Sequence, residues 1–305
     1  MPALTAGGMG LGQPRAFPPD AERGVIFDRF SWTRVSASRN RLSERYEPVQ
    51  PYFLLKLSER FPGAVFLDIG ANIGAYGITM AAQDHIAQVH AFEPNPDCAV
   101  ELRKNAELNS LSHKFVVSQL ALSDAEGTAD FARTTTYGGD AGLRHTHLFA
   151  DRIQQVTKVQ TRTLDAYWSE RTGPIVIKID VEGHEHCVIE GAKQVLERCT
   201  GCLQVEIHDQ NPSKADTLAL LADLGWHRVL KIGWDYYFSN DPGLSSDAER
   251  LRFVEDALSF LVDDSVQAAR PVRRRVLPGV VVEVAREHVQ VVRRLASLFS
   301  RKPRQ

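Results

Sequence analysis

The sequence predicts an α/β protein built on a doubly wound, mostly parallel sheet, and three observations carry that prediction. Apolar runs of strand length alternate with segments of helical pattern from residue 64 to about residue 232. The run Ile175–Asp180 is almost wholly β-branched, as expected for a central strand that is buried on both faces. Two short runs around Gly233, His227–Ile232 and Tyr236–Phe238, predict a terminal antiparallel hairpin on a seven-stranded sheet.

The other elements follow from periodicity and from start and stop residues. Asn95 with Pro96, and Thr163 alone, have the residue types that begin helices. The expected strands are Ala64–Ile69, Val89–Glu93, the region Phe115–Ala121, Thr128–Ala132, Val156–Arg162 and Cys202–His208. The expected helices are Gln50–Arg60, one from Ala75, Pro96–Asn109, Leu164–Arg171, Glu185–Arg198, Lys214–Leu224 and Ala248–Val262.

Four regions are expected along the chain. Residues 1–23 are rich in Gly and Pro and indicate a flexible leader, and residues 24–63 an N-terminal arm with a helix. Residues 64–240 form the ligand-binding domain, in which the long loop 133–155 is expected to be a lid or substrate loop. Residues 241–305 predict a helical, basic C-terminal extension.

Composition and charge limit the classes of function. No apolar run approaches the roughly 20 residues of a membrane span, and no signal peptide is evident, so we expect a cytoplasmic protein. Residues 265–305 carry ten Lys/Arg and two Glu, a charge of +8, which leaves −10 on the rest of the −2 chain. An acidic body argues against nucleic acid as a partner. The basic tail suits a peripheral membrane or protein contact, or only a solvated face, and a homodimer is also open.

The turn after the first strand predicts the ligand. The apolar run Val65–Ile69 contains Asp68 near its end and is followed by a turn with Gly70 and Gly74. A second strand then ends in Glu93. Glycines let the backbone approach a ligand, and a carboxylate at a strand end accepts hydrogen bonds from a ribose diol. A dinucleotide prefers G-x-G-x-x-G, and a carboxylate in the turn would repel a pyrophosphate. S-adenosylmethionine, which carries sulfonium and ammonium groups, is therefore favoured over NAD.

Charged residues at the end of the central strand suggest the reaction site. Lys178 and Asp180 share one face of a strand, and Glu182 follows. A buried lysine is costly unless it is paired or used, so this cluster is either a site or a structural ion pair. The next strand ends in His208 and Asp209, and ligands of open parallel sheets bind at these ends.

The strings FLDIGANIGAYG, AFEPNP, ALSDAEG, TLDAY and KIDVEGHE occur in this order, and over residues 64–232 the chain resembles the FkbM-type methyltransferase family. The resemblance implies a class I methyltransferase fold, which is Rossmann-like. It also implies S-adenosylmethionine-dependent O-methylation of a hydroxyl on a small molecule, a sugar or a secondary metabolite.

The resemblance also assigns residues by position. It implies that the methionine end of the cofactor lies against Asp68, Gly70, Asn72 and Gly74. It implies that Glu93 binds the ribose with Asn95 near it, that Ser123 and Asp124 lie by the adenine, and that Asp180 lies beside the methyl group.

Methyl transfer to oxygen needs a group that takes the hydroxyl proton. Asp180 and His208 are the candidate bases, Lys178 would hold Asp180 ionised or stabilise an alkoxide, and Glu182 completes the catalytic group. Weaker candidates are His145, His147 and His184. Asp180, His208 and Asp209 end successive strands and could bind Mg²⁺, but nothing in their spacing requires a metal, and none is expected.

Three other functions stay open on the sequence. An NAD-dependent oxidoreductase is disfavoured by Asp68 and the missing middle glycine. A non-catalytic binding protein would not need Asp68, Glu93 and Asp180 together. A methyltransferase acting on RNA or protein finds support only in the basic tail.

Overall fold

The computed structural model describes residues 50–133, 141–143 and 153–258. The described residues up to Arg250 belong to one compact unit, and the last eight, which are helical, belong to another. Residues 247–258 agree with the start of the predicted helix Ala248–Val262. The predicted leader, most of the arm and the rest of the basic extension lie outside the described residues.

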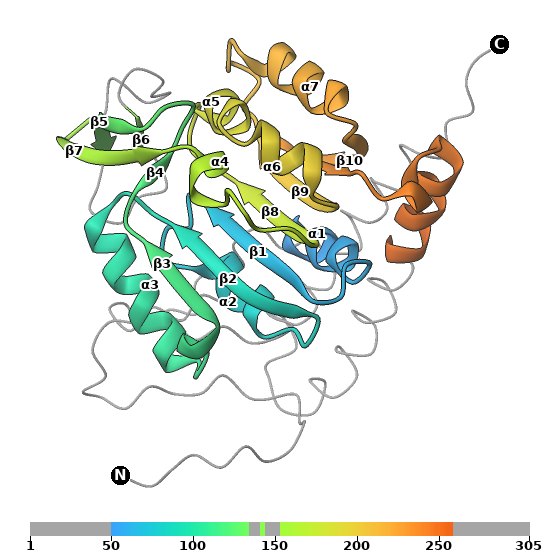
Figure 1. Ribbon diagram of the computed structural model, residues 1–305, viewed down its shortest axis with the longest axis horizontal. Helices are drawn as coiled ribbons and strands as arrows, with labels where there is room; N and C mark the ends of the chain where they lie inside the picture. The colour runs from blue at the N-terminus through green and yellow to red at the C-terminus, as the bar shows by residue number, and fades with distance from the viewer. Residues whose placement is uncertain (1–49, 134–140, 144–152, 259–305) are drawn as a thin grey trace, which may run out of the picture. The chain divides into compact units, whose positions relative to one another are not determined.

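A seven-stranded sheet forms the centre of the main unit, as predicted (Figure 1). Its strands lie in the order β10-β11-β9-β8-β1-β2-β3. Every pair from β9 to β3 is parallel, whereas β11 runs antiparallel to both β9 and β10. The strands are β1 (Ala64–Ile69), β2 (Ile86–Phe92), β3 (Phe115–Ser118), β8 (Ile175–Ile179), β9 (Gly201–Glu206), β10 (His227–Ile232) and β11 (Asp235–Ser239).

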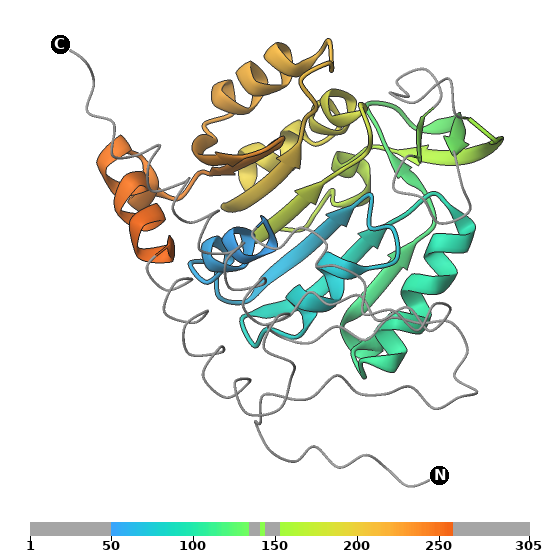
Figure 2. The same cartoon turned by 180° about the vertical axis from the view of Figure 1, so that it is seen from behind.

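Helices cover both faces of this sheet. In Figures 1 and 2, α1 (Gln50–Ser58) and α2 (Ala75–Ala81) lie on one face, and α4 (Leu164–Tyr167) and α6 (Lys193–Arg198) lie on the other. The remaining α-helices of the unit are α3 (Pro96–Leu108), α5 (Glu185–Glu190) and α7 (Lys214–Asp223). All five residues of β8 are buried, as a strand covered on both faces requires. Within the described ranges, no helix has the length and apolar character that a membrane crossing needs.

The predicted helix starts are confirmed. The Asn95 side chain accepts a hydrogen bond from the Asp97 amide at 3.1 Å, and Pro96 is the first residue of α3. The Thr163 hydroxyl accepts from the Ala166 amide, also at 3.1 Å. The helix after Thr163 is only one turn long, so its predicted end at Arg171 is wrong.

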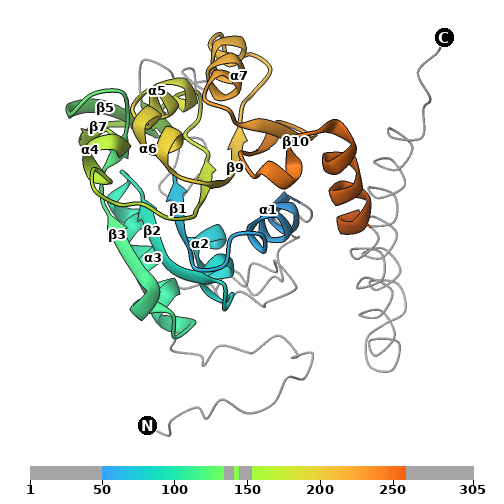
Figure 3. The same ribbon diagram turned by 45° about the vertical axis from the view of Figure 1, so that its right-hand side comes forward.

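A second, four-stranded sheet was not predicted. It contains β4 (Ala121–Leu122), β5 (Gly127–Arg133), β6 (Ala141–Leu143) and β7 (Gln155–Arg162), in the order β4-β7-β5-β6. The expected strand 115–121 is therefore split between two sheets. Part of the expected loop 133–155 is the strand β6, and most of the rest lies outside the described residues. Figure 3 shows β5 and β7 beside α5, beyond the ends of β2 and β3.

The predicted helix Glu185–Arg198 is also wrong, because it is broken into α5 and α6 at Gly191. A Cβ atom at Gly191 would lie 2.0 Å from the carbonyl oxygen of Ser123. The loop after β4 therefore passes too close to position 191 for any residue with a side chain. Close approach of two backbones is a tertiary constraint that helical periodicity does not carry.

Gly191→Ala should therefore destabilise the protein by about 2–3 kcal/mol, since the added methyl cannot be accommodated without moving backbone. Urea unfolding followed by circular dichroism measures the change. The control is Gly173→Ala: its Cβ meets nothing within 4 Å, and it carries only the cost of a left-handed φ of 114°. Equal losses in the two variants would show that contact with Ser123 is not the cause.

Candidate functional site

The site lies where the parallel strands end. Register pairs Asp68 of β1 with Lys178 of β8, and Ile69 with Ile179. Ile179 pairs in turn with Val205 of β9. The residues that follow β1, β2, β8 and β9 therefore come together at one edge of the sheet.

The turn after β1 has the backbone conformation that its glycines predict. Gly70 and Gly74 have φ of 78° and 89°, and Asn72 is left-handed as well, at 48°. The amides of Gly70 and Ala71 both donate to the Phe92 carbonyl at 3.0 Å. A Cβ at Gly70 would lie 1.8 Å from the carbonyl oxygen of Asp180, so only glycine lets this turn cross the end of β8.

Asp68 is buried beneath this turn, and only one of its two carboxylate oxygens accepts a hydrogen bond from the described residues. Its Oδ2 accepts from the Gly77 amide at 2.9 Å. Its Oδ1 has no hydrogen-bond partner among the described residues, and the same is true of the Asn72 Oδ1. Burial raises the pKa of Asp68 to about 6, against the opposing effect of the Lys178 charge. Two buried oxygens without donors indicate a place for a ligand that donates hydrogen bonds.

Glu93 is held by two backbone amides. Its Oε2 accepts from the Asn72 amide at 2.7 Å, and its Oε1 accepts from the Asn95 amide at 2.8 Å. Burial raises the pKa of Glu93 to about 7, although both hydrogen bonds lower it. Each carboxylate oxygen has capacity for a further donor, as a diol supplies.

Asn95 contributes its backbone more than its side chain. The side-chain oxygen caps α3 and also accepts from the Arg133 Nη1 at 3.0 Å. Arg133 further pairs with Asp97 at 2.7 Å and donates from its Nε to Gln155 at 3.0 Å. Arg133 was not identified from the sequence, because nothing local signals that the end of β5 meets the start of α3.

Lys178 and Asp180 form the predicted pair, with 2.8 Å between Nζ and Oδ2. The lysine also lies over the ring of Tyr76, with its Nζ 4.5 Å from the centroid. The Tyr76 hydroxyl accepts from the Gln204 Nε2 at 2.9 Å, and the same nitrogen donates to Asp235 at 2.7 Å. This polar network was missed, although a glutamine within the apolar run 202–207 was a signal.

Glu182 and His208 come together as well. The His208 Nε2 lies 3.7 Å from the Glu182 Oε2 and 3.7 Å from the Glu206 Oε1. Glu182 has a left-handed φ of 55°, an uncommon conformation for a non-glycine residue. The imidazole of His208 packs on Trp234, with 4.1 Å between ring centroids. The contact of His208 with Trp234 was not predicted.

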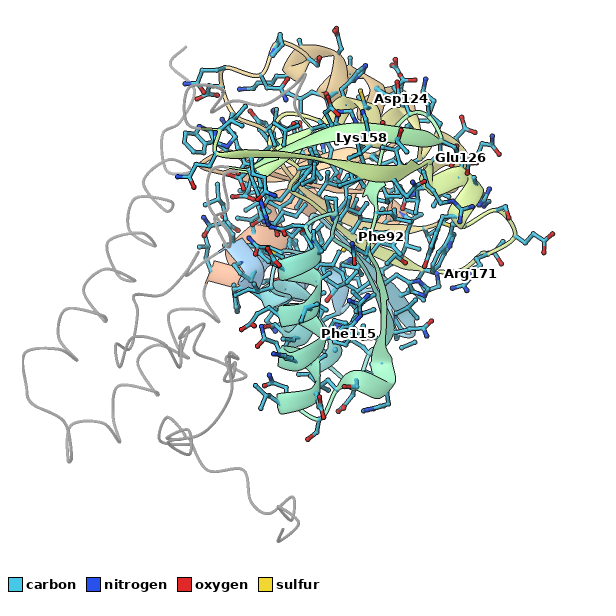
Figure 4. The ribbon with its side chains drawn as sticks, turned by 90° about the vertical axis from the view of Figure 1, so that its left-hand side faces the viewer. Phe92, Phe115, Asp124, Glu126, Lys158 and Arg171 are labelled. Carbon is cyan, nitrogen blue, oxygen red and sulfur yellow. The ribbon has the colours of Figure 1, made fainter. Side chains whose placement is uncertain are left out.

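Ser123 and Asp124 meet the end of β8 through His184. The Ser123 hydroxyl donates to Asp124 at 2.9 Å and lies 2.9 Å from the His184 Nε2. Figure 4 shows Asp124 well apart from Phe92, the residue before Glu93. Ligand atoms of Asp124, His184 and Cys187 lie within 4.8 Å of one another. The Ser123 hydroxyl contacts both Asp124 and His184, which explains why these two residues lie close together without a metal.

The suggested magnesium ligands do not come together. Asp180, His208 and Asp209 form no group of metal-ligand spacing within the part of the chain that the structure describes. Asp209 is instead paired with Lys214 at 2.6 Å. Asp180 is engaged by Lys178.

The sheet order and these strand-end carboxylates define an α/β domain of the class I methyltransferase type. The model of the methyltransferase FkbM domain matches residues 68–227, which is more than half of the chain. The chain therefore belongs to the FkbM methyltransferase family.

Three curated relatives are similar to this chain. Hexuronic acid methyltransferase AglP of Haloferax volcanii is 28% identical over 52% of this chain and 62% of its own length. The 31-O-demethyl-FK506 methyltransferase FkbM of Streptomyces tacrolimicus is 28% identical over 56% and 64%, and the 2-O-methyltransferase NoeI of Sinorhizobium fredii is 31% identical over 49% and 65%. The chain thus spans less than two thirds of each relative.

The crystal structure of methyltransferase FkbM from Methylobacillus flagellatus is 17% identical. It matches 59% of this chain and 44% of its own, with a TM-score of 0.41.

The buried carboxyls predict an unusual dependence of stability on pH. Burial raises the pKa values of Glu93 and Glu185 from 4.5 to about 7. Because each group binds its proton more tightly in the folded chain, the free energy of unfolding should fall as pH rises from about 4.5 to 7. Glu93 alone should account for about 3 kcal/mol of this decrease in the free energy of unfolding, since one pKa unit corresponds to about 1.4 kcal/mol. Glu93→Gln should abolish that part of the decrease.

Urea unfolding at pH 5 and pH 8 measures the difference. Glu107→Gln, which changes an exposed carboxylate on α3, is the control and should keep the dependence of the unchanged protein. The explanation is wrong if Glu93→Gln and Glu107→Gln show the same difference between the two pH values.

Proposed function

We propose that this domain is an S-adenosylmethionine-dependent O-methyltransferase acting on a hydroxyl of a small molecule or sugar. Glu93 carries the proposal. It is a buried carboxylate fixed by two backbone amides at the end of β2, beside a turn that only glycine permits. Such a group suits the ribose diol of a nucleoside, because it accepts two hydrogen bonds at fixed positions.

The chemistry of the surrounding donors and acceptors fits this cofactor rather than a dinucleotide. Asp68 Oδ1 and Asn72 Oδ1 are acceptors without donors, which an ammonium group supplies. The same two oxygens would repel the pyrophosphate of NAD. Bound here, S-adenosylmethionine supplies an electrophilic methyl group on a sulfonium. Ser123 and Asp124, which lie in the loop after β4, remain candidates for contact with the adenine end of the cofactor.

His208 is the better of the two candidate bases. The carboxylate of Asp180 already accepts from Lys178 at 2.8 Å, and this pair fixes the end of β8. His208 lies between the carboxylates of Glu182 and Glu206, which stabilise the imidazolium formed when it takes a proton. In this proposal His208 takes the acceptor's hydroxyl proton, Glu182 orients the ring, and Asp180 with Lys178 shapes the floor of the site.

The names of two relatives support oxygen as the acceptor atom, since one is a 31-O-demethyl-FK506 methyltransferase and another a 2-O-methyltransferase. A third is called a hexuronic acid methyltransferase. These acceptors are chemically diverse, so the hydroxyl group is the part that carries over to the proposal.

Calorimetric titration with S-adenosylmethionine, S-adenosylhomocysteine and NAD tests the cofactor. We expect micromolar binding of the two adenosyl compounds and none of NAD. Glu93→Ala should weaken binding by about 100-fold, because two charge-assisted hydrogen bonds are lost. Glu107→Ala serves as the control and should bind normally. Binding of NAD alone, or no binding of any of the three, would contradict the proposal.

His208→Asn should lower kcat by about 10²–10⁴-fold, the usual contribution of a general base. The affinity of the protein for S-adenosylhomocysteine should not change. Release of S-adenosylhomocysteine in the presence of a hydroxylated acceptor measures turnover. His227→Asn, which changes an exposed histidine on β10, is the matched control. Normal turnover in His208→Asn would remove this residue from the mechanism and return the role to Asp180.

A further inference from the structure

Trp234 is a large aromatic side chain that remains 43% exposed. It lies in the turn between β10 and β11, directly after Gly233, whose φ is 61°. Because β11 runs antiparallel to β9, this turn lies at the carboxyl edge of the parallel strands, and Asp235 pairs with Glu206, the last residue of β9. The exposed indole is thus at the edge where the proposed reaction takes place.

The indole is fixed in place although it is exposed. One side of its ring packs on His208, with 4.1 Å between centroids and 36° between planes. The Trp234 carbonyl accepts from the Ile207 amide at 2.9 Å. The neighbouring Asp209 carboxylate accepts a hydrogen bond from the Lys214 Nζ at 2.6 Å. A rigid aromatic surface binds a partner at low entropic cost.

Acceptors for hydroxyl groups stand next to this surface. The carboxylates of Glu182 and Glu206 each lie 3.7 Å from the same nitrogen of His208. Carboxylates accept hydrogen bonds and donate none when ionised, so they suit a ligand with several O–H donors. They also repel a phosphate or a carboxylate.

A saccharide ring combines the two properties that this surface demands. Its C–H groups carry partial positive charge and are attracted to the negative face of an indole. Its hydroxyls donate to neighbouring carboxylates. A planar phenol could stack in the same place but offers fewer donors, and an anionic acceptor would face two carboxylates.

We propose that Trp234 is the stacking platform of the acceptor site and that the acceptor is a neutral saccharide ring. The ring lies on the exposed part of the indole, and one of its hydroxyls faces His208. Trp234 acts as a positioning and specificity residue, not as a catalytic one. The inference rests on the proposed methyltransferase function, and it adds the class of acceptor and the residue that selects it.

The test uses the full chain, S-adenosylmethionine and a panel of neutral methyl hexosides and pentosides. A methyl hexuronide and catechol are comparison acceptors, and release of S-adenosylhomocysteine is measured. Trp234→Ala should lower kcat/KM for the glycosides by about tenfold or more, mainly through KM, as removal of a central aromatic contact does. Trp234→Phe should retain most of the kcat/KM of the unchanged protein, because a phenyl face remains.

Leu108→Ala is the control, since Leu108 is also exposed, at 41%, but ends α3 at the opposite edge of the sheet. Calorimetry with S-adenosylhomocysteine should give equal affinities for Trp234→Ala, Leu108→Ala and the unchanged protein. The platform is ruled out if Trp234→Ala and Leu108→Ala have the same kcat/KM.

The saccharide assignment is overturned if the protein binds the cofactor but methylates no neutral glycoside, or if it prefers the hexuronide or catechol. Failure to bind S-adenosylmethionine would be a different result, because it contradicts the methyltransferase proposal itself. The binding and turnover measurements together therefore separate the two.

Discussion

The site depends on a concentration of buried negative charge that the parallel strands force together. Asp68, Glu93 and Asp180 end three strands that are adjacent or one apart, and Lys178 lies among them. The lysine neutralises Asp180, while burial raises the pKa values of Asp68 to about 6 and of Glu93 to about 7. A site in this state gains free energy from a ligand that brings positive charge and hydrogen-bond donors. The charge distribution by itself thus selects against a pyrophosphate before any ligand contact is considered.

Glu93 couples two segments that are separate in sequence. Its two oxygens accept from the amides of Asn72 and Asn95, so the turn after β1 and the start of α3 are both tied to one carboxylate. The Gly70 backbone meanwhile touches the carbonyl of Asp180, which ties the same turn to β8. Three strand ends are thereby tied together by contacts within the protein. Such preorganisation reduces the ordering cost that binding would otherwise incur.

The sequence predicted the parts of this structure that local chemistry determines. The β1 turn, the Asn95 cap and the Lys178–Asp180 pair each follow from residue types at fixed spacing. The second sheet, the break at Gly191 and the bonds of Arg133 did not, because each depends on two segments meeting that only the folded chain brings together. Trp234 was overlooked for the same reason: its neighbours His208 and Glu182 come from other strand ends. Glu182 and His208 were each identified, but their 3.7 Å contact was not.

The half of the site around Glu93 and the half around His208 consist of different kinds of groups, and this difference bears on specificity. The half proposed to hold the cofactor consists of backbone amides and strand-end carboxylates, whose positions the sheet itself determines. The half around His208 consists of side chains from the end of β9 and from a hairpin turn, which can change without disturbing the sheet. A family with diverse acceptors requires such a division, because one half must stay constant while the other varies. The cofactor can therefore be inferred from motifs, whereas the acceptor has to be inferred from the tertiary surroundings of His208.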